Sequence, residues 1–197
     1  FKKWMNRLEK LQKSGRLDKI QIFFSCDAFG PEGEYVRTGL DLNVAVKNFE
    51  HLLHNTNIEQ AINSALTVTA VPGMPAMVKY INECNKIKPI YWSMMKANQY
   101  EFGLRPYLYP GIFGNKINDW GLREAVEMFE TNSYGFPDSV KSNYKIYMQG
   151  IMKEFEQREP SPRRQRDWKI YLDELDRRRG TDWTKIYPQM YDIVKDL

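Results

Sequence analysis

The sequence predicts an α/β protein in which about three parallel strands are followed by a helical C-terminal extension. In residues 1–115, short apolar segments alternate with longer segments whose apolar residues recur at helical spacing. Strands separated by helices of this length pair in parallel. From residue 116 to residue 197 the pattern is helical throughout. We therefore expect two units, 1–115 and 116–197, in this chain of 197 residues.

The strand candidates are short apolar segments rich in branched and aromatic side chains. They cover residues 19–25, 63–71, 89–95 and 107–113, the last of which is interrupted by a proline. One amphipathic helix precedes them and ends near Ser14-Gly15. Between them, a second helix is expected to be capped by Asp41, and a third opens at Pro72-Gly73. Such a sheet, with helices on one side, has open edges unless further chain pairs with it. We expect the missing strands upstream of Phe1.

The second unit is predicted to be a set of helices. Apolar and aromatic residues recur at helical spacing over 120–129, 144–155 and 168–178. Pro160-Ser161-Pro162 separates the last two segments, and Gly180 is expected to end the last helix.

Composition narrows the class of protein. No apolar run approaches the roughly 18 residues of a membrane span, so we expect no membrane association. The two cysteines, Cys26 and Cys84, lie far apart and lack metal-ligand spacing, which favours a reducing cytoplasm and no metal site in this chain. The net charge of +4 is concentrated in residues 1–20 and in an arginine-rich segment, 163–179. We interpret these segments as solvated helix faces with i,i+4 ion pairs, with a nucleic-acid interface as the alternative.

Polar side chains stand at the predicted strand ends, where parallel α/β folds bind ligands. Ser25 and Asp27 follow the first strand and are expected to project to the same side, where a hydroxyl and a carboxylate suit a ribose diol. Arg37 offers a bidentate fork for a carboxylate or phosphate. Thr67 and Thr69 share one face of the second predicted strand. No standard catalytic motif is present, so the catalytic residues are unknown.

Two segments resemble one enzyme family. Residues 25–37, Ser-Cys-Asp-Ala-Phe-Gly-Pro-Glu-Gly-Glu-Tyr-Val-Arg, followed by Asn48-Phe49-Glu50, resemble the fourth-strand region of radical S-adenosylmethionine enzymes. In that family the strand ends in Ser-x-Asp-(Ala/Gly), and an arginine follows after a loop and a first helical turn. Residues 171–183 and Tyr187-Pro188 look like the tail of the phage and marine-metagenome branch, which carries SPASM or twitch extensions.

The resemblance implies a fold and a cofactor. This chain would hold strands four to six of a partial (β/α)6 barrel, completed by a missing N-terminal half of the same protein. Ser25 would contact the ribose or amino-acid portion of S-adenosylmethionine, and Arg37 would pair with its carboxylate or ribose. Asp27 would hold the strand-end loop or add a ribose contact, and Thr67 and Thr69 would line the fifth strand facing the cofactor.

The expected function is therefore part of an S-adenosylmethionine pocket used for hydrogen abstraction by a 5′-deoxyadenosyl radical. The family binds a [4Fe-4S] cluster through CxxxCxxC near its first strand, and this motif is absent here. The resemblance thus implies a cluster in the full-length protein only, and an inactive isolated chain. The alternatives are a basic nucleic-acid-binding module and another α/β transferase, glycosyltransferase-like, that uses Asp27. The substrate is unknown.

Overall fold

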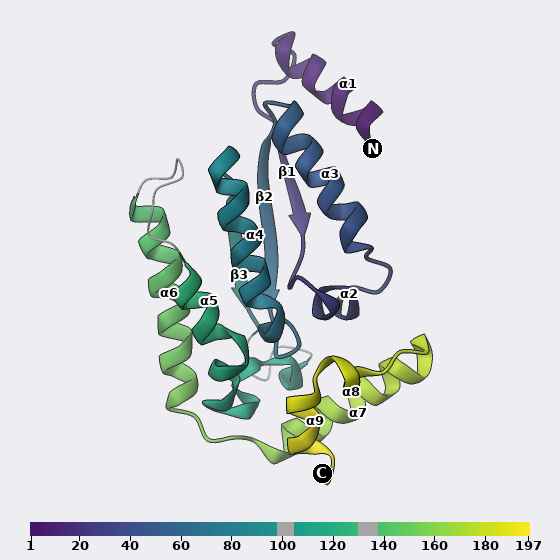
Figure 1. The fold of residues 1–197 in the computed structure, drawn as a ribbon, viewed down its shortest axis with the longest axis vertical. Helices are drawn as coiled ribbons and strands as arrows, with labels where there is room; N and C mark the ends of the chain where they lie inside the picture. Colours follow the sequence, from purple (N-terminus) through teal and green to yellow (C-terminus); the bar gives the residue numbers. More distant parts are fainter. Residues whose placement is uncertain (98–104, 130–137) are drawn as a thin grey trace.

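The structure, a computed structural model, describes residues 1–97, 105–129 and 138–197. Figure 1 shows the chain running from the α/β layer into a group of C-terminal helices. The first part contains α1 (Lys2–Lys13), β1 (Gln21–Ser25), α2 (Pro31–Val36), α3 (Leu42–Asn55), β2 (Glu59–Leu66), α4 (Met74–Ile87) and β3 (Tyr91–Lys96). The second part contains the π-helical turn η4 (Asn118–Leu122), α5 (Arg123–Met128), α6 (Asp138–Glu156), α7 (Pro162–Arg179), α8 (Trp183–Ile186) and α9 (Pro188–Val194).

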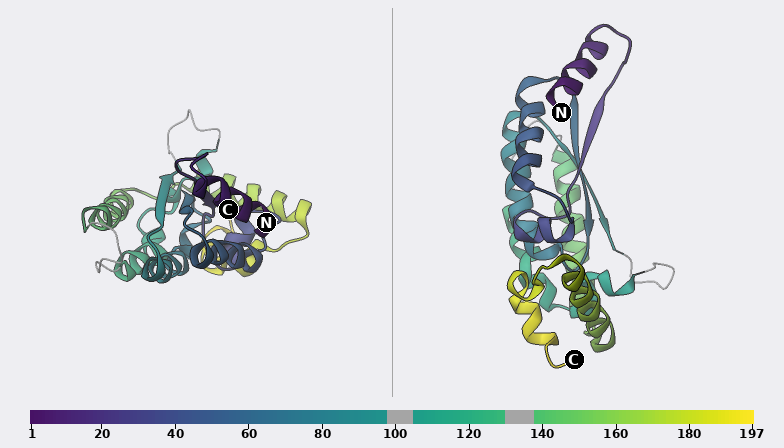
Figure 2. Two further views of the ribbon diagram at one scale, coloured as in Figure 1. Left: turned by 90° about the horizontal axis from the view of Figure 1, so that it is seen from above. Right: turned by 90° about the vertical axis from the view of Figure 1, so that its right-hand side faces the viewer.

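The described strands form one parallel sheet in the order β1-β2-β3. Ser25 pairs with Asn63, and Asn63 pairs with Ser93. Both views in Figure 2 place α3 and α4 on the same face of this sheet. On that face Phe24 of β1 packs against Phe49 of α3, with ring centroids 5.6 Å apart. The α/β class and the parallel pairing are confirmed, whereas closure into part of a barrel stays a prediction.

The opposite face of the sheet is largely uncovered. Every second residue of β1 is exposed, and Phe23 retains 52% of its accessible surface. On β3, Tyr91 is 45% exposed and Met95 74%. Helix α6 flanks only the β3 side, where Tyr144 and other residues border a groove over Phe23, Ala61 and Trp92. The sheet therefore has one face packed against helices and one face open.

Two strand predictions are wrong. The second strand is Glu59–Leu66 rather than 63–71, because polar side chains within it find buried partners: the Gln60 amide, for example, donates to the Phe49 carbonyl at 3.4 Å. After Leu66 the chain turns, with the Thr67 amide bonded to the Ala65 carbonyl at 3.0 Å. Residues 107–113 form no strand. They lie in 3₁₀ turns that begin at Pro106 and Pro110, residues that lack the amide hydrogen a strand ladder requires.

The predicted helices are confirmed. Asp41 caps α3 by accepting a hydrogen bond from the Val44 amide at 2.9 Å. Gly180 ends α7 in the left-handed conformation, with φ of 66°, which glycine adopts without steric penalty. The segment 120–129 contains a π-helical turn followed by α5.

One continuous hydrophobic core joins the two predicted units. Trp92 of β3 stacks on Phe129 at 6.0 Å, and Phe113 meets Trp168 of α7 edge-on at 5.4 Å. A polar contact adds to this packing, because Glu154 of α6 pairs with Lys96 of β3 and accepts a hydrogen bond from the buried Tyr109. The sheet and the C-terminal helices thus support one another, while the division at residue 115 stays a prediction.

Candidate functional site

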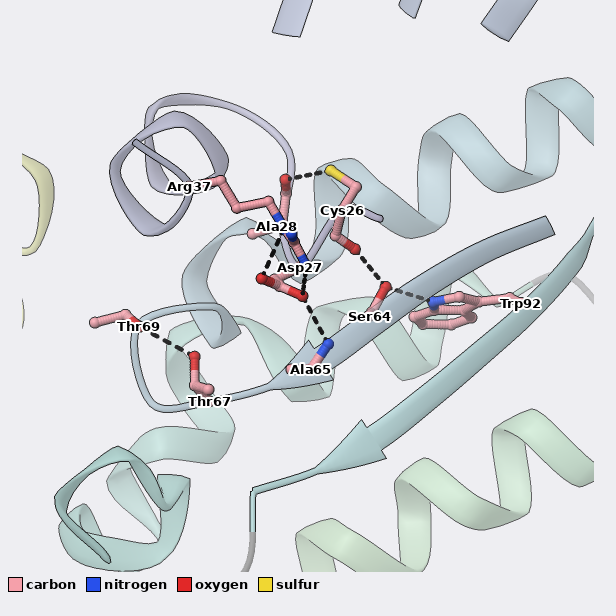
Figure 3. A network of polar contacts seen from close by, with 9 residues as sticks. All are labelled: Cys26, Asp27, Ala28, Arg37, Ser64, Ala65, Thr67, Thr69 and Trp92. Atoms are coloured by element: carbon pink, nitrogen blue, oxygen red, sulfur yellow. Dashed lines mark hydrogen bonds and ion pairs between the residues drawn. The ribbon is translucent and has the colours of Figure 1, made fainter. Parts of the chain in front are cut away.

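Asp27 is the centre of a polar network at the carboxyl end of the sheet (Figure 3). It follows β1 directly, and only 6% of its surface is exposed. One carboxylate oxygen accepts hydrogen bonds from the Ala65 amide at 2.8 Å and from Arg37 Nη2 at 3.1 Å. The other oxygen lies 3.0 Å from Arg37 Nε. Asp27 therefore ties the end of β1 to the end of β2 and holds Arg37 beside both.

Arg37 lies just beyond α2, with 39% of its side chain exposed. A guanidinium carries five N–H donors in a fixed plane. Asp27 lies along the edge formed by Nε and Nη2: Nη2 donates a hydrogen bond to it, whereas Nε approaches it as an ion pair without hydrogen-bond geometry. Nη1 has no hydrogen-bond partner among the described residues. Arg37 is thus held in place on one edge and retains donors for an anionic ligand on the other.

A second chain of hydrogen bonds fixes the strand ends relative to one another. The Trp92 indole donates to Ser64 Oγ at 2.9 Å, and the Ser64 hydroxyl donates to the Cys26 carbonyl at 2.6 Å (Figure 3). These three residues belong to three neighbouring chain segments, β3, β2 and the end of β1. The sequence did not identify Ser64 and Trp92. Their hydrogen bonds connect different strands, so their partners are known only once the strands are in register.

Ser25 makes no side-chain hydrogen bond with Asp27 or Arg37 among the described residues. It is the last residue of β1 and is exposed on the uncovered face, whereas Asp27 is buried. That Ser25 and Asp27 project to the same side stays a prediction. Ser25 begins a polar row across the sheet, because it pairs in register with Asn63 and Asn63 pairs with Ser93. The sequence alone did not identify Asn63 and Ser93.

Thr67 and Thr69 do not lie on a strand. Both belong to the turn after β2, with their hydroxyl oxygens 3.0 Å apart. They line a cavity of about 150 Å³ together with Tyr35 and with Tyr171 and Leu175 of α7. The prediction that they line the fifth strand is therefore wrong in its geometry, because β2 ends at Leu66 and the chain turns toward the C-terminal helix.

Neither cysteine is suited to bind an iron-sulfur cluster. Cys26 and Cys84 are both buried and free of disulfide bonds. Burial raises the pKa of the Cys26 thiol to about 12 and that of the Cys84 thiol to about 11, so both stay protonated near neutrality. The Cys26 thiol donates to the Ala28 carbonyl at 3.1 Å, consistent with a packing role. The sequence has two cysteines, fewer than the three of CxxxCxxC, and a cluster in the full-length protein stays a prediction.

Glu174 and Asp176 of α7 have different surroundings. Glu174 pairs with Arg177 and Arg178 on the surface, at 2.7 and 2.6 Å, as expected for a solvated helix face. Asp176 instead accepts a hydrogen bond from the hydroxyl of Tyr35, a residue of α2, at 3.0 Å. The interpretation of segment 163–179 as a solvated helix face with ion pairs therefore does not hold at Asp176, because its carboxylate makes a tertiary contact.

Comparison with known proteins adds no assignment: no family model, curated protein or solved structure matches the chain. Across the described ranges, none of the helices combines the length and the apolar character needed to span a membrane. Over the same ranges, no three His, Cys, Asp or Glu side chains are grouped so as to hold a metal ion. The geometry at the carboxyl edge of the sheet is therefore the basis for the functional assignment.

Proposed function

We propose that this chain forms part of the S-adenosylmethionine pocket of a radical S-adenosylmethionine enzyme. The observation that carries the proposal is Arg37, which Asp27 holds at the carboxyl end of a parallel sheet with guanidinium donors left over. Parallel α/β sheets bind their ligands at this edge. An arginine with one edge anchored and one edge available is suited to a carboxylate such as that of the methionyl group.

Each proposed cofactor contact is assigned to a described side chain. Arg37 would bind the carboxylate of S-adenosylmethionine, with Asp27 fixing the plane of its guanidinium. Asp27 is assigned no direct ribose contact, because both of its oxygens are engaged within the protein. Ser25 and its register partner Asn63 offer a hydroxyl and an amide on the uncovered face, and these groups can both donate to and accept from a ribose diol. Thr67 and Thr69 are not included in this pocket.

The uncovered face and the edge of β1 support a larger barrel. Among the described strands, β1 pairs with β2 alone, and Phe23 and Ser25 point to the face that α3 and α4 leave open. In a (β/α) barrel that face is the interior, and the β1 edge pairs with a further strand. We propose that further polypeptide of the same protein pairs there and brings the cysteines that hold a [4Fe-4S] cluster. When bound, the cofactor and cluster together supply one-electron hydrogen-abstraction chemistry. The proposal places the protein in the cytoplasm, with a substrate that stays unassigned.

The structure gives less support to the alternatives. A transferase that uses Asp27 needs its carboxylate to face a metal or a sugar nucleotide, whereas Asp27 is buried and bonded to Arg37 and Ala65. For a nucleic-acid interface, which needs unpaired cations, the observations are divided. Arg177 and Arg178 on α7 pair with Glu174, whereas Lys2, Lys3 and Lys10 of α1 form no ion pair among the described residues.

The proposal is tested with the protein encoded by the complete reading frame that contains these residues. After anaerobic reconstitution with iron and sulfide, the protein is mixed with S-adenosylmethionine and dithionite, and 5′-deoxyadenosine is quantified. We expect reductant-dependent product from the wild type and a loss of about tenfold or more in Arg37→Lys, which keeps a cation beside Asp27 but loses the planar fork. Arg123→Lys is the matched control, since Arg123 forms an exposed pair with Asp119 at 3.0 Å. A reading frame without a CxxxCxxC segment, or a reconstituted protein that releases no 5′-deoxyadenosine, overturns the proposal.

A further inference from the structure

A buried tyrosine connects the C-terminal helices to the segment that carries Arg37. Tyr35 lies in α2, two residues before Arg37, and is 6% exposed. Its hydroxyl donates to Asp176 Oδ1 of α7 at 3.0 Å. Its backbone carbonyl accepts a hydrogen bond from Arg179 Nη1, also at 3.0 Å. Two residues of α7 therefore hold one residue of α2 from both its side chain and its backbone.

Asp176 is itself held by the chain that follows α7. The same carboxylate accepts hydrogen bonds from the Thr181 hydroxyl and from the Trp183 amide, both at 2.5 Å. The Trp183 indole in turn donates to Asp173 at 2.7 Å. A carboxylate with this many donors has a fixed position, so it fixes the tyrosine hydroxyl that points at it.

The packing around Tyr35 strengthens the attachment. Its ring meets that of Tyr187 edge-on, with centroids 5.7 Å apart. The Arg179 guanidinium lies 5.9 Å from the Tyr35 ring centroid. Burial, together with the neighbouring charge of Asp176, raises the pKa of Tyr35, so its hydroxyl remains a donor across the physiological range.

Helix α2 depends on such an external contact because it is only six residues long. A helix of this length is not stable on its own, and its position comes from tertiary packing. Arg37 follows α2 immediately, with its amide bonded to the Gly33 carbonyl at 3.1 Å. Figure 1 places α2 between the end of the sheet and the C-terminal helices, and Figure 3 shows Arg37 directed toward Asp27.

We infer that Tyr35 and Asp176 are positioning residues for the anion-binding arginine, so that the C-terminal segment 176–183 completes the ligand site without touching the ligand. This inference rests on the proposed function for the identity of the ligand. The attachment of α2 to α7 does not, because both helices belong to this chain. Segment 176–183 thus does more than pack against α2. If it positions Arg37, loss of the Tyr35 hydroxyl weakens cofactor binding, because Arg37 is then held less firmly.

The test compares two tyrosine-to-phenylalanine variants in the protein from the complete reading frame. Tyr35→Phe removes the hydroxyl that Asp176 accepts. Tyr187→Phe is the matched control, because the Tyr187 hydroxyl is buried without a hydrogen-bond partner among the described residues and its ring contact with Tyr35 is retained. Amide hydrogen exchange over residues 33–41 reports the attachment, and equilibrium dialysis with S-adenosylmethionine reports the ligand site.

We expect Tyr35→Phe to accelerate exchange over 33–41 and to weaken cofactor binding, each by about tenfold, and Tyr187→Phe to do neither. Against an Arg37→Lys background, Tyr35→Phe should weaken binding no further, because the tyrosine acts through the arginine. Unchanged exchange over 33–41 in Tyr35→Phe overturns the inference, as does an additive loss of binding in the double variant. If the wild type fails to bind S-adenosylmethionine, the proposed function fails, and the exchange measurement still decides whether the C-terminal segment holds Arg37.

Discussion

Asp27 is the residue on which the candidate site most depends. Its carboxylate, at the end of β1, lies within 3.1 Å of the Ala65 amide of β2 and of two nitrogens of Arg37. The sequence identified Ser25 and Asp27 as polar groups at a strand end, and Arg37 as a fork for a carboxylate or phosphate. It did not reveal that Asp27 is fully engaged within the protein, since the Ala65 amide becomes its partner only when β2 is in register.

Removal of the Asp27 carboxylate should be costly to stability. Asp27→Ala leaves the Ala65 amide and the Arg37 guanidinium without their acceptor, and we expect a loss of about 3 kcal/mol in the free energy of unfolding. Asp27→Asn keeps one acceptor oxygen and should lose less. Urea denaturation monitored by tryptophan fluorescence measures both. Asp41→Ala, which removes an exposed helix cap, is the control and should cost about 1 kcal/mol. Equal losses for Asp27→Ala and Asp41→Ala would contradict the network described here.

The buried thiol of Cys26 makes a separate prediction about pH. Its pKa is raised by burial from 9.0 to about 12, so the folded state favours the protonated thiol. The stability contributed by this group is fully present below pH 9 and is lost as the pH rises toward 12. At pH 8 we expect no labelling of Cys26 by a thiol reagent in the native protein and full labelling in denaturant, as quantified by mass spectrometry. Rapid native labelling would show that the end of β1 is more open than the structure indicates.

At the scale of elements, α2 packs closely on the loop that joins it to β1. A Cβ added at Gly33 would lie 2.1 Å from the Ala28 backbone oxygen, so no larger residue fits without displacement of the loop that leads to Arg37. Gly150 in α6 has open space around the same position.

These two glycines should therefore respond oppositely to substitution by alanine. Gly33→Ala is expected to lower the free energy of unfolding by about 3 kcal/mol through steric overlap. Gly150→Ala should raise it by about 0.5–1 kcal/mol, because alanine is the better helix former. Thermal denaturation followed by circular dichroism measures both changes. A neutral Gly33→Ala would mean that the loop adapts and does not hold Arg37 rigidly.

The helices were predictable from the sequence, but the strand ends were not. Apolar residues at helical spacing and the cap at Asp41 define helices locally, and those predictions are confirmed. The second strand was placed too late because its first half carries Glu59 and Gln60, whose polar side chains suggest a loop. Apolar content favoured a strand at 107–113, whereas Pro106 and Pro110 favour the 3₁₀ turns that form there.

At the scale of the whole molecule, the C-terminal helices belong to the same core as the sheet. Aromatic contacts such as Phe113 with Trp168 connect them, and Tyr35 with Asp176 adds a polar connection across 141 residues of sequence. No local pattern could predict this last contact, because it depends on how α7 packs against α2. The fold class was thus readable from periodicity, whereas the tertiary support of the candidate site was visible only in the structure.

The most direct test of the account is the affinity of the protein from the complete reading frame for S-adenosylmethionine, measured by equilibrium dialysis. The account predicts that the wild type and Arg123→Lys bind with equal dissociation constants, and that Arg37→Lys binds about tenfold or more weakly, since a lysine cannot reproduce the bidentate fork. Binding by Arg37→Lys as tight as that of the wild type, or no binding by the wild type, would contradict the claim that this edge of the sheet receives the cofactor.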